Sequence, residues 1–108
     1  MNRSRFKVVQ PAQFKVEVII GSLPDGKTMD DISFRCTFSS GGKSIELDNS
    51  EFHKISTKLG NRYIAPLSSD LLGKGDVMMT VTAEIPDSAF STGHRKDVDI
   101  CDTLVTIV

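Results

Sequence analysis

The 108-residue sequence is poor in aromatic residues, with six phenylalanines, one tyrosine and no tryptophan. A surface that stacks single-stranded nucleic acid needs several exposed aromatic side chains interleaved with basic residues. An excess of charge of either sign is also missing, since 13 basic residues nearly balance 14 acidic ones. Nonspecific binding to nucleic acid depends on lysine and arginine meeting phosphate, so we expect no nucleic-acid partner.

Long hydrophobic runs are absent as well. No stretch approaches the ~18–20 apolar residues that cross a bilayer. The charged start of the sequence is not followed by an apolar segment. We therefore expect no transmembrane segment, no signal peptide and no membrane partner.

Only two cysteines are present, Cys36 and Cys101. Their wide separation would suit an inter-sheet disulfide in an immunoglobulin-like sandwich, but there is no tryptophan to pack on such a bridge. Their strand phases also disagree, because Cys36 shares the inward phase of Phe34 whereas Cys101 shares the phase of Asp97 and Asp99. We expect two reduced thiols, with a disulfide left as the alternative if a β-bulge changes the phase.

The sequence does contain short runs in which apolar and polar residues alternate, separated by clusters of Gly, Pro, Asp or Asn. In the clearest run, Val77, Met79, Val81 and Ala83 share one face. A period of two is typical of a β-strand with one buried side. Strands are predicted at residues 6–9, 14–20, 31–39, 44–48, 52–57, 63–67, 76–85 and 97–108.

The spacing of these strands and turns predicts an all-β fold, an immunoglobulin-like two-sheet β-sandwich of seven to nine short antiparallel strands. At this length we expect a single domain, residues 1–108. Residues 1–13 are interpreted as an N-terminal arm plus a short first strand, and 68–72 as one helical turn. Three aromatic residues fall in strand phase and are predicted core residues, namely Phe14, Phe34 and Phe38.

No constellation of residues indicates catalysis. Asp87, Ser88, His94 and Asp97 are close in sequence. Catalytic triads converge from separate elements, so this proximity indicates a polar loop between two strands. The glycine pair around Lys74 lacks the spacing of a phosphate-binding loop and is interpreted as a turn before a strand. We predict no catalytic residue, no cofactor and no enzyme activity.

No metal site is predicted. Asp102 lies close in sequence to the two candidate ligands, Asp97 and Asp99. These two share a strand face that Asp30 and Asp31 could approach in space. Several carboxylates together could hold calcium, but no glycine-rich calcium loop is present. Tyr63 is the one candidate for a sugar contact. A small ligand-binding module, specific for calcium or for a carbohydrate, is therefore the alternative function.

A longer pattern runs through the second half of the sequence. It covers Arg62–Phe90, with a Leu-Gly-Lys-Gly turn at 72–75 and a motif Pro-Asp-x-x-Phe-x-x-Gly-x-Arg at 86–95. This stretch resembles small β-sandwich proteins from prophages and mobile elements of gut bacteria, which in turn look like the N-terminal domain of phage baseplate upper proteins. The opening of the sequence fits more loosely, through Phe14–Val16 and Pro24–Gly26.

The resemblance implies a noncatalytic structural or adaptor protein of a phage or prophage virion, acting in the baseplate, tail or fibre through protein–protein contacts. Members of the family usually form homo-oligomers, so the expected partners are other virion structural proteins and further copies of this chain. We expect no receptor-binding or fibre region after Val108, and this expectation favours an attachment or adaptor subunit. Such a subunit would be found in the virion, or in the host-cell cytoplasm before assembly. The expected contact residues belong to the basic N-terminal arm, a glycine-rich loop and the last strand: Arg3, Arg5, Lys7, Gly41, Gly42, Val105 and Ile107.

Overall fold

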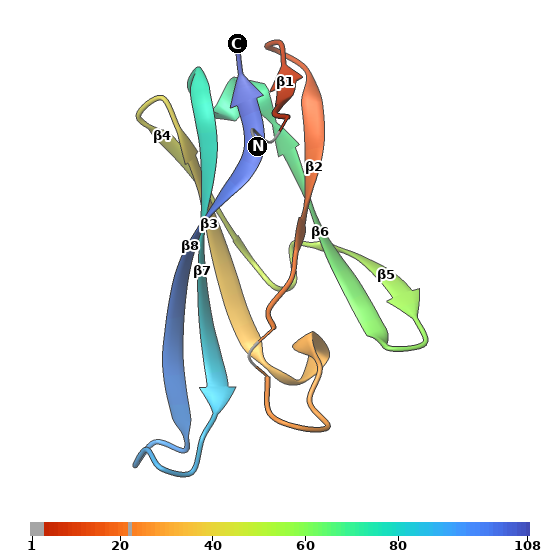
Figure 1. The fold of residues 1–108 in the computed structure, drawn as a ribbon, viewed down its shortest axis with the longest axis vertical. Helices are drawn as coiled ribbons and strands as arrows, with labels where there is room; N and C mark the ends of the chain where they lie inside the picture. Colours follow the sequence, from red (N-terminus) through yellow and green to blue (C-terminus); the bar gives the residue numbers. More distant parts are fainter. Residues whose placement is uncertain (1–3, 22) are drawn as a thin grey trace.

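Two β-sheets pack face to face in the computed structural model, which describes residues 4–21 and 23–108 (Figure 1). The larger sheet has five strands in the order β1-β8-β7-β3-β4, and the smaller has three in the order β2-β6-β5. The strands are β1 (Phe6–Val8), β2 (Gln13–Val18), β3 (Ser33–Ser40), β4 (Lys43–Asp48), β5 (His53–Thr57), β6 (Gly60–Ser68), β7 (Gly75–Pro86) and β8 (His94–Ile107). The prediction of an all-β, two-sheet sandwich is confirmed.

Two features of the larger sheet differ from the prediction. β1 runs parallel to β8, with Phe6 opposite Val105, whereas the other strand pairs of the described residues are antiparallel. β7 and β8 are also long rather than short, with 12 and 14 residues. The two strands stay paired up to Pro86 opposite His94, so β8 begins before Asp97, where its start was expected.

Two short 3₁₀ helices connect strands, η1 (Met29–Asp31) and η2 (Ser69–Leu71). η1 replaces the predicted start of the third strand. The Thr28 hydroxyl accepts a hydrogen bond from the Asp30 N–H, and the Asp31 carboxylate accepts one from the Thr28 N–H, so this reciprocal cap turns the chain before β3 begins. η2 forms at the predicted helical turn. Within residues 4–21 and 23–108, no helix has the length and apolar character needed to cross a membrane.

The core lies between the two sheets. The inward side chains of β7 are all buried, as their alternation predicts: Val77, Met79, Val81, Ala83 and Ile85. Phe34 contacts the rings of Phe52 and Tyr63 at centroid distances of 5.5 and 5.1 Å. Phe14 and Phe38 are also buried, so the three predicted aromatic core residues are confirmed. Tilted and edge-on aromatic contacts of this kind add to the free energy gained from burial alone.

Both cysteines are free thiols, but the predicted disagreement of their strand phases is wrong. Cys36 pairs with Val81 and Cys101 pairs with Met79, and both partners are inward residues of β7. A disulfide is excluded because β7 separates the two cysteines. Neighbouring strands are ~4.8 Å apart, so strands two places apart exceed the ~7 Å that a disulfide allows between Cα atoms. Burial raises the pKa of the Cys36 thiol to about 12, whereas Cys101 is exposed.

Candidate functional site

β8 contains a bulge where its pairing with β7 shifts. Asp76 pairs with Thr106 and Met78 pairs with Asp102, so β8 advances four residues while β7 advances two. Leu104, inside the bulge, has a φ of +62°, in the left-handed region that a bulky side chain rarely adopts. Such a conformation persists only where surrounding contacts hold it.

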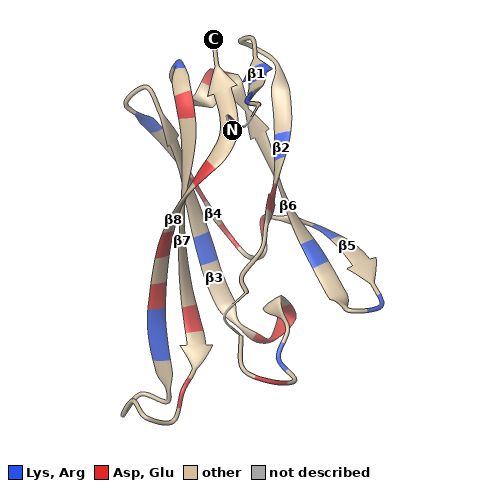
Figure 2. Ribbon diagram, viewed as in Figure 1, with Lys and Arg blue, Asp and Glu red and all other residues tan. Residues whose placement is uncertain are grey.

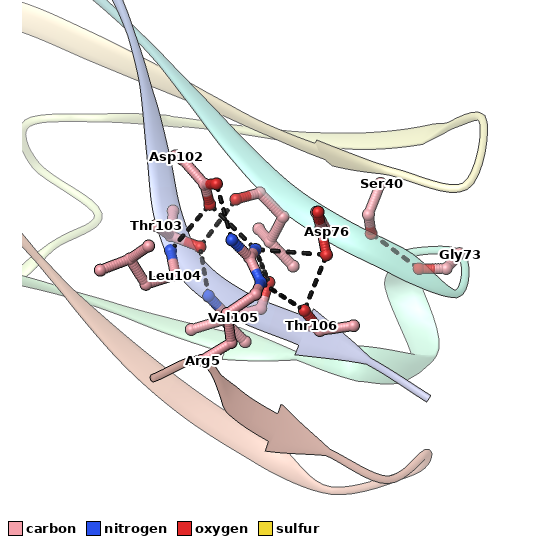
Figure 3. A network of polar contacts seen from close by, with 10 residues as sticks. Arg5, Ser40, Gly73, Asp76, Asp102, Thr103, Leu104, Val105 and Thr106 are labelled. Carbon is pink, nitrogen blue, oxygen red and sulfur yellow. Dashed lines mark hydrogen bonds and ion pairs between the residues drawn. The ribbon is translucent and has the colours of Figure 1, made fainter. Parts of the chain in front are cut away.

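Arg5 supplies many of these contacts (Figure 3). Its guanidinium donates to both carboxylate oxygens of Asp102, at 2.7 and 2.9 Å, and to the Thr106 hydroxyl at 2.7 Å. It also donates to the Val105 carbonyl at 3.2 Å and lies 3.3 Å from the Asp76 carboxylate. A planar fork of N–H groups fits a carboxylate at two points, so Arg5 ties the start of β1 to both sides of the bulge. We call these five residues the Arg5 network.

Side chains of β8 also satisfy backbone amides inside the bulge. The Leu104 N–H donates to the Asp102 carboxylate at 2.9 Å, and the Val105 N–H donates to the Thr103 hydroxyl at 3.3 Å. The Thr103 hydroxyl in turn donates to the Val77 carbonyl at 2.7 Å. These bonds compensate for ladder hydrogen bonds that the bulge removes. Together with the Arg5 network they hold Leu104 in its left-handed conformation.

β1 and Arg5 cover one part of the outer edge of β8 and leave the rest open. β1 pairs with residues 105–107, and Arg5 reaches Asp102. Among the described residues, no strand pairs with the outer edge of residues 94–101, which we call the free edge (Figure 1). Backbone N–H and C=O groups of such an edge point away from the sheet and can pair with another strand.

Two apolar side chains of the free edge are exposed. Val98 and Ile100 have exposed fractions of 55% and 71%. They lie on the outer face of the larger sheet, because the residue between them pairs with the inward Val81. β-branched side chains are favoured where strands pair, so this patch is suited to a cross-strand contact.

The sign of the charge changes along the free edge. His94, Arg95 and Lys96 come first, and Asp97 and Asp99 follow. Figure 2 shows the basic band of β8 closer to the β7–β8 loop than the acidic bands. Arg95, one of the basic residues, forms an ion pair at 3.1 Å with Asp97, the first of the acidic residues. The free edge therefore has a basic half and an acidic half.

The predicted contact residues of the arm and the last strand occupy different settings. Arg3 lies outside the described residues. Arg5 belongs to the Arg5 network, and Lys7 is an exposed side chain of β1. Val105 and Ile107 are 7% and 1% exposed, so their side chains pack in the core and a partner would meet other residues of β8.

Gly41 and Gly42, the predicted contact loop, form the turn between β3 and β4 with φ angles of +54° and +81°. A Cβ on Gly73 would lie 2.5 Å from the Gly41 carbonyl oxygen, so the two glycines are in close backbone contact. The Gly73 N–H donates to the Ser40 carbonyl at 3.0 Å, and the Ser40 hydroxyl donates to the Gly73 carbonyl at 2.7 Å. The turn is thus fixed to the segment that enters β7.

Asp97 and Asp99 are neighbours on the core-facing side of β8, at the uncovered margin of the sheet. In the described part of the chain, no three His, Cys, Asp or Glu side chains gather in a group that could hold a metal ion. The predicted approach of Asp30 and Asp31 would have made such a group, and it is not observed. The Asp31 carboxylate instead caps η1.

Tyr63, the candidate sugar contact, is 1% exposed, so its ring presents no face to a ligand. Its hydroxyl donates to the Asp30 carboxylate at 2.5 Å. Burial, together with this carboxylate, raises the pKa of Tyr63 to about 12. The same hydrogen bond, with further ones from Asn61, lowers the pKa of Asp30. Tyr63 therefore connects η1 to β6 and has a structural role.

The motif at 86–95 forms the loop between β7 and β8. Asp87 accepts hydrogen bonds from the Ala89 N–H at 3.0 Å and from Arg95 at 3.1 Å, and these contacts lower its pKa. The Asp87 N–H donates to the Gly93 carbonyl at 2.9 Å, and Gly93 has a φ of +80°. The Asp87 carboxylate is thus directed at Arg95 and at the loop backbone, whereas the His94 ring is exposed. The motif closes a hairpin.

A scan against protein-family models, a search of curated proteins and a search of solved structures each found no match to this chain. The likeness to phage β-sandwich proteins therefore rests on the motifs of residues 62–95. In the structure these residues form β6, η2, β7 and the loop into β8. Their glycines and Asp87 fix the turns that set the start and end of β7.

Sequence reasoning missed the Arg5 network and the free edge. Arg5 and Asp102 are 97 positions apart, so no local pattern connects them. The free edge depends on strand order, which alternation of side chains does not determine. One signal was present: Val98 and Ile100 alternate with acidic residues, as in a strand that is exposed on both faces.

Proposed function

We propose that this chain is a noncatalytic structural or adaptor protein of a phage or prophage virion, acting in the baseplate, tail or fibre through protein–protein contacts. The observation that carries the proposal is the free edge of β8, where backbone groups and the side chains of Val98 and Ile100 are open to another strand. The viral setting rests on the resemblance of residues 62–95 to phage β-sandwich proteins. Its partners are other virion structural proteins and further copies of the chain.

The surroundings of the free edge support a contact of this kind. The Arg5 network fixes the bulge at one end, and the ion pair of Asp87 with Arg95 fixes the loop at the other. An edge that is ordered before binding loses less conformational entropy when a strand pairs with it. The sandwich therefore presents a preformed docking edge.

Fractionation of virus particles tests the proposed function. An antibody against the chain is used on particles released after prophage induction and purified in a density gradient. The chain is expected to sediment with the tail or baseplate proteins in a fixed ratio, and nuclease and high-salt washes control for trapped host protein. A chain that stays wholly in the soluble fraction, while intact particles lack it, would overturn the proposal.

A further inference from the structure

The composition of the free edge points to a specific partner. We propose that two copies of this chain pair through their free edges, antiparallel, about a two-fold axis that passes between the two Asp99 residues. A closed symmetric pair uses the same surface on both copies, so the surface must be complementary to itself. The inference rests on the proposed function, because it names the partner of the docking edge described there.

The order of charges makes the free edge complementary to itself in one direction only. In an antiparallel pair centred on Asp99, Lys96 of each copy lies opposite Asp102 of the other and Asp97 lies opposite Cys101, so only Asp99 meets its own charge. In a parallel pair, each half would face its own charge. Opposite charges directly across two strands stabilise the pair and like charges destabilise it. The sequence of the edge therefore selects antiparallel pairing.

The apolar residues select the register. With the axis at Asp99, Val98 of each copy lies opposite Ile100 of the other, on the exposed outer face of the joined sheet. Lys96 then lies opposite Asp102 on the same face, and it adds a second cation to a carboxylate that Arg5 already binds. Only the two Asp99 side chains meet a like charge. Pairing over 96–102 extends one residue past the free edge to Asp102 and stops at the bulge, beyond which Arg5 contacts Val105 and β1 occupies the edge.

Two alternative registers that keep both sheet faces aligned lie nearest, and both are less favourable. With the axis at Ile100, Val98 would face the charged Asp102. The pairing would also shorten to 98–102, because the bulge follows.

With the axis at Val98, the apolar Ile100 would face Lys96. Asp97 would also face Asp99 in both copies, which doubles the contacts between like charges. The register on Asp99 is therefore the one that the edge supports.

The other edge strands of the described residues offer fewer exposed apolar side chains. β2 also has opposite charges, Lys15 and Glu17. However, its Phe14 and Val18 are buried, and Glu17 is paired with Arg62.

On β5, Lys54 has no acidic counterpart, and the one large apolar residue of the strand, Ile55, is 39% exposed. On β4, Ile45 and Leu47 pack partly against the core, so they are less available to a second chain. The free edge of β8 combines an open backbone, two exposed apolar side chains and a reversal of charge.

A single added strand pair makes a small interface, and interfaces below ~1,200 Å² are typically weak. The experiment therefore covers a wide range of protein concentration, from about 10 μM to about 1 mM. The mass of the purified chain is measured by sedimentation equilibrium, starting from 11.8 kDa for one copy. The wild-type chain is expected to change from one copy to two across this range.

Three variants test the register. Ile100→Lys places a charge opposite Val98 and is expected to weaken the dimer at least tenfold. Leu59→Lys is the matched control, because Leu59 is 90% exposed in the β5–β6 turn, and it is expected to leave dimerisation unchanged. Asp99→Asn removes the central contact between like charges and is expected to strengthen the dimer severalfold.

A wild-type chain that stays monomeric at all concentrations would overturn self-pairing, as would an Ile100→Lys variant that dimerises as well as wild type. Weaker association of Asp99→Asn would contradict the register even if Ile100→Lys were unfolded. Failure here can be distinguished from failure of the proposed function. A monomeric chain that still sediments with particles would leave the virion role in place and assign the free edge to a different protein.

Discussion

Tyr63 shows at the scale of one residue how burial and a single hydrogen bond define a role. It is the first of three consecutive buried residues of β6, and its hydroxyl reaches Asp30 of η1. A buried hydroxyl needs a partner, and a carboxylate is a strong one. The residue that looked like a sugar contact in the sequence instead closes the core.

The titration of Tyr63 tests this role. Because its pKa is raised, the folded chain keeps the phenol proton to higher pH than the unfolded chain, whose tyrosine titrates near ~10. The stabilisation is fully present below that pH and is lost as the pH rises towards about 12. The contribution of Asp30 to stability has the opposite pH dependence. Its pKa is lowered by folding, so its contribution is lost as the pH falls through that pKa.

The measurement is simple because the chain has one tyrosine and no tryptophan, so tyrosinate absorbance reports Tyr63 alone. We expect a midpoint near 12 in native buffer and near ~10 in denaturant. Equal midpoints in the two conditions would show that the hydroxyl is not held by Asp30. The Tyr63→Phe variant is expected to lose about 1.5 kcal/mol of stability, the typical contribution of a hydrogen bond to a charged group.

At the scale of elements, β8 is divided by its bulge into two parts with different neighbours. The part beyond the bulge lies in the core and pairs with β1 on its outer edge. The part before it extends with β7 to a closed loop, and its outer edge is open. Arg5 lies at the boundary, so it determines where pairing with β1 ends.

Replacement of Arg5 tests this boundary. Arg5→Ala removes every contact to Asp102 and Thr106, and Arg5→Lys keeps the charge but not the two-point fit to the carboxylate. Both variants are expected to lower the melting temperature by a few degrees and to speed amide exchange at residues 6–8. Lys7→Ala, an exposed change on the same strand, is the control. Unchanged exchange at β1 in both Arg5 variants would mean that backbone pairing alone holds it.

Strand existence could be predicted from this sequence, and strand arrangement could not. Alternation located β7 and its buried face, because side-chain period depends only on local geometry. The parallel pairing of β1 and the bulge at Leu104 depend on contacts with distant residues such as Arg5. The face of Cys101 was assigned wrongly because its acidic neighbours suggested solvent on that side, and they lie at an uncovered margin of the core face.

For the whole molecule, the unequal size of the sheets leads to the proposed function. Five strands face three, so the larger sheet extends beyond the smaller one and the first part of β8 forms an open margin (Figure 1). Pairing of two such margins would join the larger sheets of two copies into one continuous sheet. The virion role and the self-pairing of the chain both depend on this edge.

Hydrogen exchange of the wild-type chain at low and high protein concentration tests this central claim most directly. If the free edge is the contact surface, those amides of residues 96–102 that point away from β7 will exchange more slowly at high concentration, while amides of the β5 edge will not change. The slowing reports new backbone hydrogen bonds, which only strand pairing supplies at these positions. Exchange that is independent of concentration, or protection that appears along β4 or β5 instead, would contradict the account.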